Sequence, residues 1–89
     1  MTTILNNKTI LKPGHLVKTT QNHLWGSTKY WSTAARAWQD IPVGSHALII
    51  SISIDNLKVS FLYQDSLYHI DNCYNDEQGI PYWCQIINE

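Results

Sequence analysis

Two stretches between residues 46 and 63 alternate hydrophobic and polar positions, and a short polar link joins them. In the first stretch the even positions, from His46 to Ile54, are mostly apolar, while the odd positions mix apolar residues with serines. In the second stretch the apolar side chains fall on odd positions, such as Val59 and Phe61. A period of two residues is typical of a strand with one buried face. We therefore predict a β-hairpin that turns at residues 55–56 and buries the even positions of its first strand.

A further strand is expected directly after the turn signal Pro13-Gly14. The Leu-Val-Lys-Thr run that follows favours a strand, because β-branched residues fit a pleated sheet. The ten residues at the start of the chain are polar and weakly patterned. They predict an extended arm or a short edge strand.

Residues 20–40 show no sustained alternation and are too many for a bare connection, which is typical of a functional loop. Within them, Ser32-Thr33 precedes an alanine-containing run that ends at Trp38. A hydroxyl can cap free backbone amides and alanine favours helix, so one or two helical turns are an alternative to an irregular loop here.

Two more turn signals divide the rest of the chain. Residues 41–44, Ile-Pro-Val-Gly, lead into the hairpin, and residues 64–66 lead into a short strand over residues 67–70. Residues 71–78 have the composition of a polar loop. The bulky residues of the stretch 79–87 predict a last strand that packs along the others.

Eighty-nine residues, of which 44% are hydrophobic, are enough for one domain with a modest core. We expect an N-terminal arm over residues 1–10, the main fold over residues 11–70 and a closing loop and strand over residues 71–89. Charged residues make up only 15% of the chain. Residues 1–46 carry a net charge of +4 and residues 47–89 a net charge of −5, which a compact fold would place side by side.

The order of these parts resembles the SH3-like small β-barrel of the bacterial and phage type. The resemblance is carried by the Lys-Pro-Gly-His-Leu-Val run at residues 12–17, the long loop after it, the turn at residues 41–44 and the hairpin. It implies an all-β fold, a small barrel of about five strands and a capacity for binding, but no activity. The acidic pairs that line the peptide groove of eukaryotic signalling SH3 domains are missing from residues 20–40, which argues against polyproline binding.

Side chains that could carry catalysis are dispersed along the chain. A nucleophile needs a serine or cysteine against a histidine that a carboxylate orients, and His15, His23, His46 and His69 are far apart in sequence. We expect His46 at the end of the inner face of its strand, and solvated acids in the loop 71–78. No glycine-rich phosphate loop is present. The sequence therefore predicts neither an enzyme nor a cofactor.

Cys73 and Cys84 are the two cysteines of the chain. The absence of a secretory signal favours reduced thiols over a disulfide, and it predicts a cytoplasmic protein, or one of the host cytoplasm if a phage encodes it. A zinc site from these thiols and His69 is not expected, because structural zinc sites usually show two close pairs of ligands. No apolar run approaches the ~20 residues of a membrane span, so no membrane partner is expected.

The aromatic residues of the long loop and of the C-terminal stretch are the main functional candidates. Tryptophan and tyrosine supply large contact areas at low entropic cost and are enriched among interface hot spots. A core with a single phenylalanine must also use some tryptophans, so we expect about half of this group to be buried. With a neighbouring cation added, the candidate partner- or ligand-binding residues are Trp25, Tyr30, Trp31, Arg36, Trp38, Tyr82 and Trp83.

These features predict a non-enzymatic protein–protein interaction or assembly module, such as a small phage or bacterial accessory protein, with another protein as its partner. A second hypothesis is a protein that binds or sequesters a small planar, nucleotide-like ligand between aromatic rings and Arg36. A third is a structural subunit of a larger particle, which would form oligomers. Nucleic acid is not an expected partner, since six basic residues against seven acidic ones give little attraction to phosphates.

Overall fold

The computed structural model describes residues 4–5, 9–20, 29–53, 58–71 and 74–88. Over these residues the chain is all-β, as the sequence predicts, and contains no helix. The described strands are β1 (Ile4–Leu5), β2 (Leu16–Thr19), β3 (Tyr30–Ser32), β4 (Ala37–Gln39), β5 (His46–Ile52), β6 (Lys58–Tyr63), β7 (Ser66–Asp71), β8 (Tyr74–Asn75) and β9 (Cys84–Ile86).

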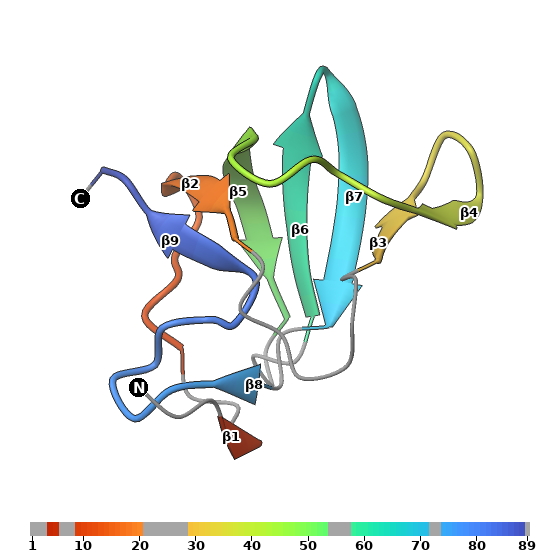
Figure 1. Cartoon of the computed structure of the whole chain (residues 1–89). Helices are drawn as coiled ribbons and strands as arrows, with labels where there is room; N and C mark the ends of the chain where they lie inside the picture. Colours follow the sequence, from red (N-terminus) through yellow and green to blue (C-terminus); the bar gives the residue numbers. More distant parts are fainter. Residues whose placement is uncertain (1–3, 6–8, 21–28, 54–57, 72–73, 89) are drawn as a thin grey trace.

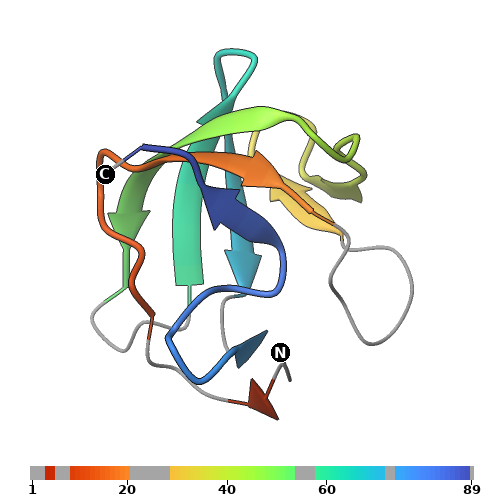
Figure 2. The same cartoon turned by 60° about the vertical axis from the view of Figure 1, so that its left-hand side comes forward.

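Seven of these strands form one antiparallel sheet in the order β4-β3-β7-β6-β5-β2-β9 (Figure 1). Strands β1 and β8 pair separately. The large sheet curves strongly around its inner face (Figure 2). Its outermost strands, β4 and β9, are not hydrogen-bonded to each other, so the sheet stays open. The expected closed barrel of about five strands is therefore not confirmed.

The predicted hairpin over residues 46–63 is present as β5 and β6, while its link at residues 55–56 lies outside the described residues. The prediction for the buried face of β5 is wrong. Ile49 is only 1% exposed, whereas Leu48, Ile50 and His46 point outward and Ile50 is 41% exposed.

A β-bulge between Ile49 and Ser51 is the physical reason for that error. A bulge adds one residue to one strand, so the alternation of inner and outer positions changes parity across it. Before the bulge the odd positions face the core, and after it Ile52 packs against the core. The even apolar positions therefore do not share one face.

The core centres on three aromatic rings from distant parts of the chain. Phe61 of β6 stacks on Trp83, which directly precedes β9, with 5.2 Å between the ring centroids. Tyr30 of β3 meets both rings edge-on, at 5.7 Å from Phe61 and 6.0 Å from Trp83. Since β3 and β9 lie near opposite ends of the sheet order, this packing is possible only because the sheet curves.

Residues 30–39 form a hairpin, β3–β4, where the sequence suggested a loop or a helical turn. Ser32 does cap amides, because its Oγ accepts a hydrogen bond from the Ala35 N–H at 3.1 Å and its carbonyl accepts one from the Arg36 N–H at 2.8 Å. The capped element is a turn with Arg36 at a positive φ of 53°. The helix preference of the alanines is overridden by the pairing of β3 with β7.

The turns predicted at residues 41–44 and 64–66 are both present, except that Ser66 already belongs to β7 and the second turn is Gln64 and Asp65. Gly44 has a φ of 89°, which suits glycine, and buried Thr19 anchors this turn by donating its hydroxyl to the Pro42 carbonyl at 2.8 Å. Gln64 and Asp65 both have positive φ, as the two central residues of a tight hairpin turn require. This two-residue turn sets the register of β6 and β7.

The neighbouring residues Ile49 and Ile50 allow a matched test of the inner face. Ile49→Ala should lower the free energy of unfolding by about 2–5 kcal/mol, because it leaves a cavity in the core. Ile50→Ala should change it by no more than about 0.5 kcal/mol, because the side chain is exposed. Urea denaturation of both variants measures the difference, and equal losses would contradict the register given for β5.

Candidate binding site

A row of side chains crosses the outer face of the sheet from β4 to β6. The register places Trp38 opposite Trp31, Trp31 opposite His69, and His69 opposite Ser60. Tyr30 and Ser32 on either side of Trp31 are buried, and so are Val59 and Phe61 on either side of Ser60, so alternation turns Trp31 and Ser60 outward. Pairing of β3 with β7 thus places Trp31 directly beside His69, with Trp38 on the far side of Trp31.

Trp31 and Trp38 form the most prominent feature of this row. Their ring centroids are 5.3 Å apart and the rings meet edge-to-face at 69°, a geometry that the ring quadrupoles favour. Trp31 is partly buried, whereas Trp38 is 56% exposed. All three residues of β4 are exposed. Trp38 is therefore a large apolar side chain supported by a second ring and open to solvent.

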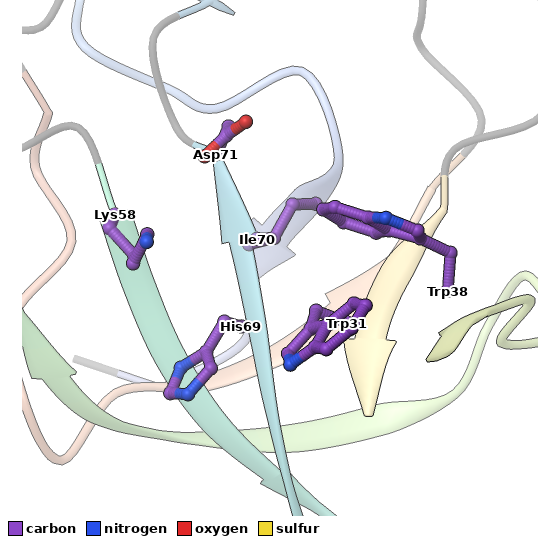
Figure 3. A pocket seen from close by; sticks show the side chains of 6 residues that line it. All are labelled: Trp31, Trp38, Lys58, His69, Ile70 and Asp71. Atoms are coloured by element: carbon purple, nitrogen blue, oxygen red, sulfur yellow. The ribbon is translucent and has the colours of Figure 1, made fainter. Parts of the chain in front are cut away.

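A hollow of about 440 Å³ lies beside the two indoles, and we call it the tryptophan hollow. Figure 3 shows both indoles on one side of it and Lys58 on the other, with His69 between them. The register places Lys58 directly opposite Asp71, so a cation and an anion lie at the same end. The lining residues are Trp31, Trp38, Lys58, His69, Ile70 and Asp71.

His69 is positioned by Ser60, whose Oγ lies 2.7 Å from the histidine Nδ1. This pair alone does not make a nucleophile site. No carboxylate is bonded to the His69 ring in the described part of the chain, and Ser60 lies in the middle of a paired strand rather than on an exposed turn. The arrangement fixes the imidazole as a polar group in the wall of the hollow.

The structure separates the predicted site residues into different groups. Trp31 and Trp38 line the tryptophan hollow. Arg36 is exposed in the β3–β4 turn and does not line it. Trp25 lies outside the described residues.

The other three predicted site residues, Tyr30, Tyr82 and Trp83, lie in the core or pack against it. Tyr30 and Trp83 are buried in the core, at 1% and 0% exposure. Tyr82 is partly buried, packs against the same core and donates its hydroxyl to the Asp71 carbonyl at 3.4 Å. Among the described members of the aromatic group, Tyr30 and Trp83 are buried, Trp31 and Tyr82 are partly buried and Trp38 is exposed.

Three polar residues of the hollow, Lys58, His69 and Asp71, were not predicted as parts of a binding site. The turn at residues 64–65 could have indicated that these residues lie together. A two-residue turn places residue 60 opposite residue 69, and residue 58 opposite residue 71. The pairing of β7 with β3 had no comparable signal. A hairpin over residues 30–39 had to be recognised before the tryptophans could be placed beside His69.

A second row on the outer face is apolar. Directly paired leucines cross four strands in the order Leu16, Leu48, Leu62 and Leu67. Leu48 and Leu62 are exposed, and the other two are partly buried. This row lies next to the row of Trp31 and His69, so the outer face of the sheet is less polar than a solvated face usually is.

Asp76 and Cys84 in the C-terminal part are buried within the fold. Asp76, expected to be solvated, is buried, and its Oδ1 accepts hydrogen bonds from the N–H groups of Gln78 at 2.8 Å and Ile80 at 3.0 Å. Cys84 is a buried free thiol, and Cys73 lies outside the described residues. Among the residues that the structure describes, no three metal-ligating side chains cluster.

Burial raises the pKa of the Tyr30 hydroxyl, with smaller contributions from the nearby Tyr82, Cys84 and Asp40. Burial likewise raises the pKa of the Cys84 thiol. In the unfolded chain these groups ionise near their ordinary values of about 10 and 8.5. Both groups are protonated in both states at lower pH. As the pH rises past the unfolded values, the unfolded chain loses protons first and becomes favoured.

Stability should therefore fall as the pH rises above about 8.5 for Cys84 and above about 10 for Tyr30, and it should keep falling toward the raised pKa of each group. Tyr30→Phe should make the fall above about pH 10 shallower. The phenylalanine keeps the ring contacts with Phe61 and Trp83 but cannot ionise. The measurement is the urea midpoint as a function of pH for both proteins. An unchanged dependence on pH in the variant would contradict the burial of this hydroxyl.

The described part of the chain contains no helix of the length and hydrophobicity that a bilayer crossing requires.

The chain was compared with models of protein families, with curated proteins and with solved structures. No family model, no curated protein and no solved structure matches it.

Proposed function

We propose that this chain is a non-enzymatic binding module whose contact surface is the tryptophan hollow together with the exposed strand β4, and whose partner is another protein. The observation that carries the proposal is the exposure of Trp38, at 56%, on an edge strand. A large ring held in place by a second ring has little freedom left to lose on binding. This is a property of interface hot-spot residues, among which tryptophan is enriched.

The surroundings of Trp38 support the same function. The indoles give the hollow an apolar wall, and Lys58 and Asp71 give it charges at the opposite end. An apolar centre with a polar rim is the usual anatomy of a protein interface. His69, fixed by Ser60, adds a hydrogen-bonding group that could select a partner's orientation.

The order of the parts also supports a binding role. A strand after Pro13-Gly14, a turn at residues 41–44 and the β5–β6 hairpin are the features shared with SH3-like small barrels, and we retain that likeness as part of the proposal. The likeness concerns the order of elements rather than closure, since the sheet is open. Folds of this kind support many functions, so the argument for binding comes from the hollow itself.

Peptides selected from a random library on the immobilised chain should bind through Trp38. Trp38→Ala should weaken their binding at least tenfold, because it removes the exposed ring. Val43→Ala is the matched control, since Val43 is also a large exposed apolar residue but lies in the turn at residues 41–44. Isothermal titration of each variant gives the affinities, and equal binding by the wild type and Trp38→Ala would overturn the proposal.

A small planar ligand is the second candidate, and the size of the hollow favours it. Its volume of about 440 Å³ falls within the range of small-molecule sites. Indole rings can stack on a planar group, and Lys58 can bind an anion. The structure changes one element of this hypothesis, because the cation that lines the hollow is Lys58 and not Arg36.

The four ribonucleoside monophosphates are suitable probes for this candidate. A bound nucleotide should raise the melting temperature, since a ligand of the native state stabilises it by mass action. Lys58→Ala should abolish that rise, while Arg36→Ala should leave it. A thermal-shift assay at millimolar nucleotide measures both, and no rise with any of the four would count against a nucleotide ligand.

A further inference from the structure

The hydrogen bonds of β3 show which backbone groups of β4 face the open edge. The Thr33 N–H donates to the Leu67 carbonyl at 3.1 Å, so this pair is a hydrogen-bonded one. Hydrogen-bonded pairs recur at every second position, so Trp31 also directs its backbone groups toward His69 on β7. The pair of Trp31 with Trp38 is then a non-hydrogen-bonded one. Trp38 consequently directs its own N–H and C=O away from β3, toward the edge of the sheet.

That edge has the properties of a pairing surface. Within the described residues β3 is the strand that pairs with the backbone of β4, and no residue of β4 is buried. An edge strand with free backbone groups is a template for another strand, and proteins that avoid such pairing usually blunt the edge with charges or proline. Strand β4 itself, Ala-Trp-Gln, contains neither a charge nor a proline.

The residues on either side of Trp38 indicate what strand would fit. Arg36 lies two positions before it and Asp40 two positions after it. In an antiparallel pairing centred on Trp38, the end of β4 that Arg36 precedes lies beside the end that Asp40 follows in the other copy, so Arg36 of each copy comes near Asp40 of the other. Two oppositely charged pairs therefore form from one sequence, which is the self-complementarity that a two-fold interface needs.

The position of Asp40 strengthens this match. Its carboxylate is held by Lys29, the residue directly before β3, with 2.8 Å between Lys29 Nζ and Asp40 Oδ1. Both side chains are largely exposed, so the ion pair leaves the carboxylate open to a second cation. In the paired arrangement the Asp40 carboxylate would lie between Lys29 of its own copy and Arg36 of the other.

We propose that β4 pairs antiparallel with β4 of a second copy of this chain, about a two-fold axis at Trp38. The proposal rests on the contact surface proposed above and names its partner. The two Trp38 residues exchange backbone hydrogen bonds, and their rings lie on the same face. The row Trp31–Trp38 continues into the same row of the other copy, and the two tryptophan hollows open on one face of a continuous sheet.

Reversing the charge of Arg36 or Asp40 tests the proposal, because the proposed interface predicts which of the variants can pair with each other. Arg36→Asp places two carboxylates opposite each other at both charge pairs, and Asp40→Arg places two guanidinium groups there. Each variant alone should therefore dimerise at least tenfold more weakly than the wild type. An equimolar mixture of the two variants should form heterodimers, because both charge pairs are then complementary. The variant with both substitutions should recover the wild-type homodimer.

Sedimentation equilibrium to about 1 mM protein measures these associations, since interfaces smaller than ~1,200 Å² are often weak. Lys12→Asp and Glu77→Arg are matched controls, because they make the same changes of net charge at exposed sites away from β4, and they should dimerise like the wild type. A monomeric wild type, a dimer indifferent to Arg36→Asp, or controls that weaken equally would each overturn the pairing.

Failure of the self-pairing can be distinguished from failure of the proposed binding function. The charge variants keep Trp31 and Trp38, so they should still bind the peptides selected on the wild type. A monomeric wild type that binds those peptides through Trp38 overturns the self-pairing and leaves the binding module in place. A dimer that follows the charge rules, in a chain whose selected peptides ignore Trp38, supports the self-pairing and overturns the role proposed for the hollow.

Discussion

The stack of Trp83 on Phe61, closed on one side by Tyr30, is the contact on which the rest of the structure depends. It joins a residue just before the last strand to the middle of the sheet and to the strand beside β4. Rings of this size bury a large apolar area, which a domain of 89 residues has few other ways to gain. The curvature of the sheet follows, because a flat sheet could not bring β3 and β9 over the same core.

That curvature also determines where binding can occur. The inner face is filled by core side chains, so exposed aromatic and apolar groups gather on the outer face and at the edges. Adjacent residues take opposite roles through strand alternation: Tyr30 enters the core and Trp31 lines the hollow. Strand β3 thus contributes to the core with one face and to the hollow with the other, and the proposed binding would depend on the same strand as stability.

Sequence patterns predicted the strands β2, β5, β6, β7 and β9 and the turns at residues 41–44 and 64–66, because β-branched runs and turn residues act locally. They failed where a long-range or irregular feature decided the outcome. One extra residue at the bulge after Ile49 reversed the inner face of β5. Pairing with β7 turned residues 30–39 into a hairpin despite their alanines. The same limits apply to the candidate site. The aromatic composition grouped Trp31 and Trp38 with Tyr30 and Trp83, although the second pair is buried. Composition could not separate the two pairs, because burial depends on tertiary position rather than on residue type.

The central claim is that the tryptophans divide between two tasks: Trp83 holds the curved sheet together and Trp38 is presented for contact. Fluorine NMR of the chain labelled with 5-fluorotryptophan, with each signal assigned by substitution, tests this directly. A soluble paramagnetic reagent should broaden the Trp38 signal strongly and leave the Trp83 signal sharp. Equal broadening of the two signals, or a protected Trp38 beside an accessible Trp83, would contradict the account.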